Sequence, residues 1–141
     1  MDNRPMSQIV NRRQPVTLSP QATVQEACRL MRDQRIGAIL ITDESGNLLG
    51  IFTGRDAVSR VVAEARNPAS TVLEEVMTRN PDSMPAELHA IDALRLMWDG
   101  GFRHVPVTKQ GRLAGIVSRG DFRGLEQARL DEETGYWEAM R

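Results

Sequence analysis

One short motif occurs twice in the sequence and contains the residue types best suited to chemistry. It reads Gly-Ile-Phe-Thr-Gly-Arg-Asp at residues 50–56 and Gly-Ile-Val-Ser-Arg-Gly-Asp at residues 115–121. Each copy places a hydroxyl, Thr53 or Ser118, three residues before a carboxylate, Asp56 or Asp121. This spacing is typical of a helix cap. At a strand end the same groups can also hold a phosphate and the paired hydroxyls of a ribose, and the two interpretations are compatible.

The near-neutral charge argues against a polyanionic partner. Eighteen basic residues oppose nineteen acidic ones, for a formal net charge of −1. We therefore expect neither a nucleic-acid nor a membrane partner. Lys109 is the only lysine, so the other cations are arginines. Genome composition explains most of this bias, but the planar arginine fork also suits phosphate groups.

The remaining reactive residue types indicate neither a metal site nor catalysis. Cys28 is the only cysteine, which excludes a disulfide within the chain and a cysteine-based zinc site and favours a reducing cytoplasm. It lies on an apolar helix stripe and is expected in the core. His89 and His104 are separated by a predicted helix, so an imidazole metal site is not expected. No nucleophile with a nearby base and no phosphate loop is visible, so we expect no enzyme.

An internal repeat organises the chain. Residues 27–33 match residues 93–99, and the glycine turns and motifs that follow match in the same order. Each copy has apolar residues at the spacing of an amphipathic helix, then two short apolar runs joined by a polar glycine turn, then a further helix. The helix stripes are 24, 27, 28, 31 and 90, 93, 94, 97, and the runs are 38–41, 48–52, 105–107 and 113–117. The sequence predicts an α+β (α/β) fold with two strand–helix–strand–strand–helix units.

A unit of this size cannot bury a core alone, so the two are expected to pack sheet to sheet with pseudo-two-fold symmetry. The second helix of the first unit should carry one apolar face, formed by Ala57, Val58, Val61, Val62 and Ala65. The expected divisions are an N-terminal segment at 1–13, a first repeat at 14–66, a linker at 67–76, a second repeat at 77–128 and a C-terminal helical tail at 129–141. A further short helix is predicted at 71–77.

The tandem copies resemble a pair of CBS (cystathionine β-synthase) domains, a Bateman module, over about residues 14–128. The resemblance rests on residues 76–81, 93–97 and 104–107 and on both seven-residue motifs. It implies two βαββα units and two clefts for adenosine-containing ligands, namely AMP, ADP or ATP, with NAD or S-adenosylmethionine as further possibilities. It also implies a non-catalytic regulatory module, a homodimer and an unidentified regulated protein.

The resemblance assigns ligand-binding residues to each cleft. Asp56 and Asp121 would hold ribose hydroxyls, and Thr53 and Ser118 would contact ribose or phosphate. The cleft of Asp121 would also use Thr17, Gly37, Ala38, Arg103, His104 and Ile116, and the cleft of Asp56 would use Ile51 and backbone around Ser83 and Val105. Backbone next to Ala38 and Val105 would read the adenine.

Several features leave alternatives open for these clefts. Arg55 and Arg119 lie inside the motifs, where each is either a phosphate ligand or a solvated cation at a helix start. Pro106 stands where the first copy has Leu40, so adenine recognition by the two clefts is expected to be unequal. His104 is either a phosphate or pH-sensing group or a satisfied core histidine. A constitutive dimeric scaffold, whose motifs only cap helices, is the alternative to a nucleotide sensor.

Overall fold

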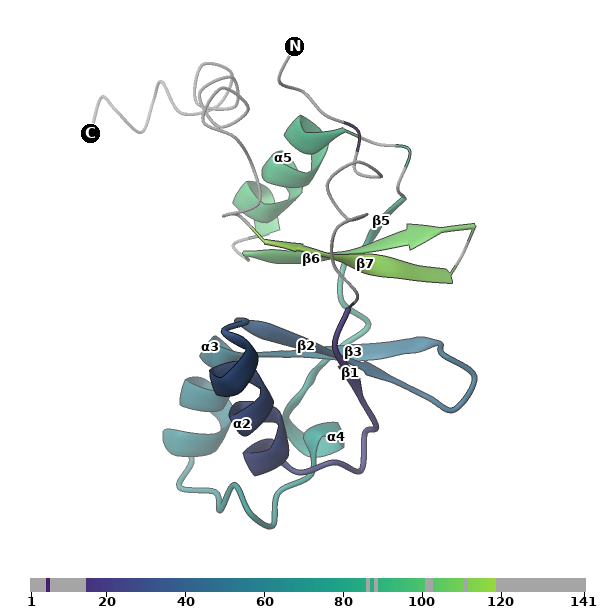
Figure 1. Cartoon of the computed structure of the whole chain (residues 1–141). Coiled ribbons are helices and arrows are strands. Elements are labelled where there is room, and N and C mark those ends of the chain that lie inside the picture. Colours follow the sequence, from purple (N-terminus) through teal and green to yellow (C-terminus); the bar gives the residue numbers. More distant parts are fainter. Residues whose placement is uncertain are drawn as a thin grey trace, which may run out of the picture. The chain divides into compact units, whose positions relative to one another are not determined.

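The chain folds into two compact units, shown in Figure 1. The first unit is Pro15–Pro81, and the second unit combines Met1–Gln14 with Asp82–Arg141. The computed structural model describes residues 5, 15–85, 87, 89–100, 103–110 and 112–118. Each unit contains a small sheet with helix on one face, so the predicted α+β class is confirmed. The packing of one sheet on the other stays a prediction.

The first helix, α2 (Val24–Gln34), forms where the apolar stripe predicts it. It begins because the Thr23 hydroxyl accepts a hydrogen bond of 3.2 Å from the backbone N–H of Glu26. It ends at Arg35, whose φ of 55° is left-handed and cannot continue the helix. Along the stripe, the Val24 and Ala27 side chains are fully buried, whereas those of Cys28 and Met31 are half-buried against the same core.

The sheet of the first unit has the order β1-β2-β3-β4. β1 (Thr17–Leu18) runs parallel to β2 (Ala38–Thr42), which is antiparallel to β3 (Leu48–Thr53), and β4 (Thr78–Arg79) is antiparallel to β3. Side chains alternate between the two faces of a strand. Ile39, Ile41 and Phe52 therefore form the core beneath the helices, and Ala38, Leu40 and Ile51 lie on the other face.

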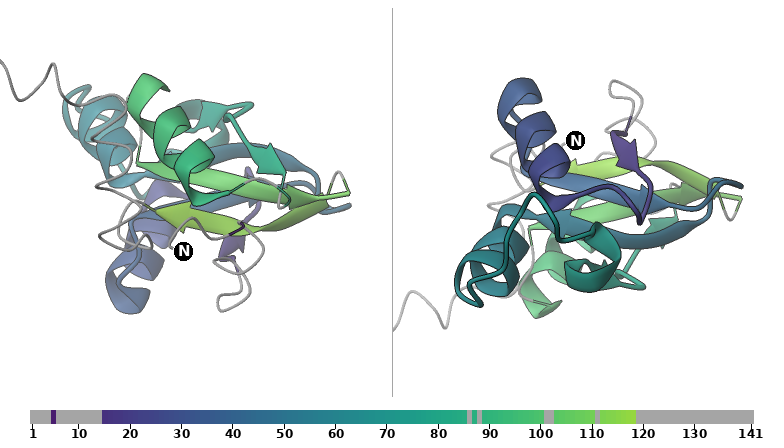
Figure 2. Two further views of the ribbon diagram at one scale, coloured as in Figure 1. Left: turned by 90° about the horizontal axis from the view of Figure 1, so that it is seen from above. Right: turned by 90° about the horizontal axis from the view of Figure 1, so that it is seen from below.

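The second helical segment differs from the sequence prediction. It starts as α3 (Gly54–Asp56) and continues as the π-helix η1 (Ala57–Val62), with a 2.9 Å hydrogen bond from the Ala63 N–H to the Val58 carbonyl. The predicted apolar face is only partly buried, because Val61 is buried but Val58 and Val62 are 63% and 73% exposed. Seen from below in Figure 2, α2 and η1 lie toward the same end of the sheet.

The first unit extends beyond the segment expected to close it. α4 (Leu73–Val76), shorter than the helix predicted at 71–77, buries the Leu73 and Val76 side chains completely in the core of this unit. β4 then adds to its sheet. Residues 67–76, expected as a linker, and residues 78–79, expected to open the second copy, thus lie within the first compact unit. They pack there because buried apolar side chains and strand pairing outweigh the break at Pro68.

The second unit repeats the arrangement in its described part. β5 (Met84–Pro85) is parallel to β6 (His104–Lys109), and β6 is antiparallel to β7 (Arg112–Ser118). α5 (Ala90–Gly100) buries its predicted stripe against this sheet; the buried cluster includes Ala90, Ala93, Leu94, Met97, Val105, Val107 and Val117. The helix expected near Gly120 and the tail lie outside the described residues. Within the described ranges, no helix has the length and apolar character needed to cross a membrane.

Asp43 holds the turn between β2 and β3. Its Oδ1 accepts hydrogen bonds from the backbone N–H groups of Ser45 and Asn47, both at 2.9 Å, and its Oδ2 accepts one of 3.0 Å from the Asn47 amide. These bonds, with those of Asn47 foremost, stabilise the ionised carboxylate and hold the pKa of Asp43 below its ordinary value.

We therefore expect acid to loosen this turn. Because the pKa is lower in the folded state, the ionised Asp43 carboxylate stabilises the fold. This contribution to stability is fully present above the unfolded-state pKa of about 3.9 and is lost as the pH falls through the folded-state pKa. An NMR titration of the Asp43 carboxyl carbon should show the depressed pKa, and Asn47→Ala should raise it toward the ordinary value. An Asp43 pKa that is the same in both proteins would contradict this role for Asn47.

Candidate functional site

Strand register gathers the predicted site residues of the first unit on one sheet face. Ala38 pairs with Thr53, and Leu40 pairs with both Ile51 and Thr17. Because directly paired residues point to the same face, these side chains all lie opposite the core beneath α2. The Gly37 carbonyl also accepts a hydrogen bond of 3.3 Å from the Gly54 N–H, which keeps Gly37 beside the start of α3.

The predicted site residues of the second unit occupy the equivalent paired positions of its sheet. His104 pairs with Ser118, as Ala38 pairs with Thr53, and Pro106 pairs with Ile116, as Leu40 pairs with Ile51. These four residues lie on the face opposite α5, whereas the Val105 side chain lies in the core beneath that helix. The structure therefore brings together, within each unit, a hydroxyl at the end of the second hairpin strand and the first residue of the hairpin strand beside it.

The other predicted site residues do not belong to these paired strand positions. Ser83 is exposed between β4 and β5, Arg103 is exposed just before β6, and Arg55 is exposed in the first turn of α3. Arg119 and Asp121 lie outside the described residues. The sites they would complete in the second unit therefore stay predictions.

Thr53 and Asp56 form a reciprocal cap at the start of α3. The Thr53 backbone N–H and hydroxyl both donate to Asp56 Oδ2, at 3.0 and 3.2 Å, and the Asp56 N–H donates to the Thr53 hydroxyl at 3.3 Å. This is a capping box, which satisfies backbone groups that a helix start leaves unpaired. The capping interpretation of the motif is confirmed for the first copy.

The second oxygen of Asp56 faces β4 and η1. Thr78 donates its hydroxyl to Asp56 Oδ1 at 3.2 Å, and the Arg60 Nε lies 3.7 Å from the same oxygen. Arg60 Nη1 also donates to the Val76 and Met77 carbonyl oxygens, at 3.3 and 2.9 Å. Asp56, only 8% exposed, thus joins the helix start to the strand that follows α4.

Sequence reasoning missed Thr78 and Arg60 as partners of Asp56. The only signal for Arg60 was its position four residues after Asp56, where a helix brings opposite charges together. Thr78 gave no signal, since its approach depends on the pairing of β4 with β3.

The arrangement can accept hydrogen bonds from a ligand. A carboxylate has about four acceptor positions, so Asp56 can serve the capping box and Thr78 and still accept a bond from a hydroxyl at its exposed edge. Among the residues that the structure describes, no three His, Cys, Asp or Glu side chains come together as a metal site requires.

The family model for the CBS domain matches residues 6–63 and 73–126. The chain therefore belongs to the CBS domain family, with two copies in tandem, which confirms the resemblance seen in the sequence.

Known relatives agree with this assignment. The CBS domain-containing protein CBSCBSPB2 of Arabidopsis thaliana is 41% identical over 102 residues, which cover 72% of this chain but only 19% of that protein. The chain thus spans about a fifth of the length of the plant relative. The crystal structure of the CBS-domain containing protein ATU1752 of Agrobacterium tumefaciens is 36% identical, with a TM-score of 0.75, and the match covers 87% of this chain and 97% of that one.

A further solved structure contains a nucleotide. The CBS domain protein PAE2072 of Pyrobaculum aerophilum, complexed with AMP, has a TM-score of 0.81 over 91% of this chain and 98% of that one. Its sequence identity is 22%, so the likeness is one of fold.

Proposed function

We propose that this chain is a non-catalytic regulatory module that binds adenine nucleotides of the AMP, ADP and ATP class. The proposal rests on one strand pairing that occurs in both units. In each, a hydroxyl residue at the end of one strand pairs with the first residue of the neighbouring strand: Thr53 with Ala38, and Ser118 with His104. The AMP bound to a protein of the same fold supports the ligand class. NAD and S-adenosylmethionine share the adenosine group and remain alternative ligands.

The proposed roles follow the chemistry of the ligand. Asp56 and Asp121 accept hydrogen bonds from ribose hydroxyls, and Thr53 and Ser118 contact ribose or phosphate. Arg55, Arg103 and Arg119 supply positive charge to the phosphates. Thr17, Gly37, Ile51, Ser83, Pro106 and Ile116 line the two sites, and backbone beside Ala38 and Val105 reads the adenine.

Alanine at Asp56 and at Asp121, singly and together, tests these roles. A ligand at a hundredfold excess over its Kd stabilises the folded state by about 2.7 kcal/mol. We expect AMP to raise the melting temperature of the unchanged protein, each single variant to reduce that rise, and the double variant to abolish it. Asp33→Ala removes an exposed carboxylate in the first unit and serves as the matched control, with the full AMP response.

The capping box gives a second candidate function its specific support. If the motifs only cap helices, the chain is a constitutive interaction scaffold. Asp56→Ala then lowers the melting temperature without ligand, by the equivalent of about 1 kcal/mol, and leaves the rise caused by AMP unchanged. The ligand-induced rise, rather than the melting temperature itself, therefore separates the two functions.

We extend the proposal to a homodimer in the cytoplasm that acts on a regulated protein. The homodimer and the regulated protein are implied by the family resemblance, and the single cysteine favours a reducing compartment. Native mass spectrometry of freshly purified protein should show twice the 15.8 kDa chain mass together with any ligand that co-purifies.

A further inference from the structure

One partner of Asp56 comes from a strand outside the duplicated motif. Residues paired across the four strands of the first unit form one row on the sheet face opposite the core; the row is Thr17, Leu40, Ile51 and Thr78. Thr53 follows Ile51 by two residues in β3, so its side chain points to the same face. Thr78 therefore lies on the face that carries the residues assigned to the nucleotide.

The sheet fixes the position of the Thr78 hydroxyl. Thr78 pairs with Ile51, and β4 lies so near β3 that a Cβ on Gly50 would be 2.8 Å from the Thr78 carbonyl oxygen. From this position the hydroxyl donates to Asp56 Oδ1 at 3.2 Å. The contact thus depends on β4, which is far from the motif in the sequence.

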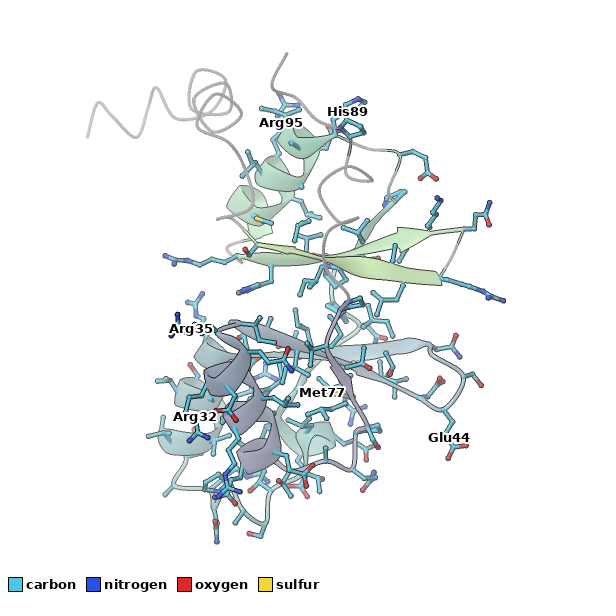
Figure 3. All side chains as sticks on the ribbon, in the orientation of Figure 1. Arg32, Arg35, Glu44, Met77, His89 and Arg95 are labelled. Atoms are coloured by element: carbon cyan, nitrogen blue, oxygen red, sulfur yellow. The ribbon has the colours of Figure 1, made fainter. Side chains whose placement is uncertain are left out.

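Arg60 approaches the same carboxylate oxygen from η1. Its Nε lies 3.7 Å from Asp56 Oδ1, a separation that fits charge pairing rather than a hydrogen bond. Its Nη1 donates to the Val76 and Met77 carbonyl oxygens at the end of α4, at 3.3 and 2.9 Å. Figure 3 labels Met77. These two bonds keep the positive charge of Arg60 beside Asp56.

Asp56 keeps capacity to accept a hydrogen bond from a ligand while both of its oxygens are held. Oδ2 accepts two hydrogen bonds from Thr53, and Oδ1 accepts one from Thr78, out of about four that a carboxylate can accept. An acceptor that is already oriented binds a hydroxyl more tightly, because less side-chain freedom is lost on binding. The charge of Arg60 also offsets the repulsion between Asp56 and the phosphate of a nucleotide.

We propose that Thr78 and Arg60 are positioning residues of the nucleotide site, which hold the Asp56 carboxylate where it accepts hydrogen bonds from the ribose hydroxyls. This role rests on the proposed function and adds two residues that lie outside the seven-residue motif. Selectivity for ribose then depends on β4 and η1 as well as on the motif. A purely structural role would change the affinity for all adenine nucleotides alike.

Two nucleotides test this role: AMP, and 2′,3′-dideoxyadenosine monophosphate, which lacks both ribose hydroxyls. Their dissociation constants are measured by calorimetry in chains that carry Asp121→Ala, which weakens the other proposed site. We expect Thr78→Val to weaken AMP binding about fivefold, the effect of losing one hydrogen bond, and Arg60→Gln to weaken it about threefold. Neither variant should change the affinity for the dideoxy nucleotide. Thr78→Ser keeps the hydroxyl and should keep the AMP affinity.

Thr71→Val and Arg66→Gln are the matched controls in the first unit. The Thr71 hydroxyl donates to the Asn67 carbonyl oxygen at 2.7 Å, and Arg66 pairs with Glu75 at 3.2 Å, so neither of these contacts involves Asp56. Both control variants should bind the two nucleotides as tightly as the chain with Asp121→Ala alone.

The outcomes separate this role from the proposed function itself. If AMP binds, equal weakening of both nucleotides by Thr78→Val and Arg60→Gln, or no weakening of AMP by either, would overturn the positioning role. Circular dichroism shows whether each variant is folded; if Thr78→Val is not, Arg60→Gln decides. If the chain with no substitution binds no AMP, the proposed function is wrong, and the positioning role is wrong with it.

Discussion

Replacing Phe52 with alanine should lower the free energy of unfolding of the first unit by about 3–5 kcal/mol. The Phe52 ring is fully buried in the core beneath α2, together with Val24, Ile39 and Leu73. Truncation removes its apolar contacts and leaves a cavity that the surrounding side chains fill only in part. Since a domain is stable by only about 5–15 kcal/mol, this single change removes a large part of the stability that is typical of a domain. Chemical denaturation followed by circular dichroism measures the loss.

Val58→Ala is the control for that experiment. It also truncates an apolar side chain in the first unit, but Val58 is 63% exposed, so the free energy of unfolding should change by no more than about 0.5 kcal/mol. Similar losses in the two variants would show that Phe52 is not the centre of this core.

Replacing Gly50 with alanine should destabilise the same unit by roughly 1–3 kcal/mol, because β4 passes too close for a side chain. A Cβ at this position would lie 2.6 Å from the Met77 Sδ and 2.8 Å from the Thr78 carbonyl oxygen. The methionine side chain can move, but the carbonyl belongs to the backbone of β4, which would have to shift. Such a shift would also disturb the hydrogen bond between Thr78 and Asp56. Figure 3 labels Met77 in this region of the first unit.

Gly54 offers a matched glycine four residues away. A Cβ at Gly54 would meet nothing within 4 Å, so Gly54→Ala should leave the unfolding free energy nearly unchanged or raise it slightly, since alanine favours the helix. If Gly50→Ala proved as harmless as Gly54→Ala, the close approach of β4 to β3 would be contradicted.

The sequence predicts the elements whose signal is local. The apolar spacing identifies α2 and α5, and paired apolar runs around polar turns identify the β2–β3 and β6–β7 hairpins, because side-chain periodicity follows directly from backbone geometry. It fails where distant segments meet. Nothing near residues 73–79 indicates that α4 and β4 complete the first unit. Apolar spacing also reveals neither the π-helical turn nor the exposure of Val58 and Val62.

The same distinction applies to the candidate site. The spacing of Thr53 and Asp56 was enough to predict the cap, since both groups belong to one helix start. The donation from Thr78 to Asp56 required strand pairing between residues far apart in the chain. Asp56 therefore makes more structural contacts than the motif alone indicates. Its role in binding has to be tested through the rise in melting temperature that AMP causes.

The most direct test of nucleotide binding is calorimetric titration of AMP into protein freed of bound ligand by unfolding and refolding. The proposed function predicts saturable binding at one or two sites per chain, with guanosine monophosphate binding much more weakly because the sites read adenine. No saturable heat with AMP, ADP, ATP, NAD or S-adenosylmethionine, in protein that melts cooperatively, would contradict it.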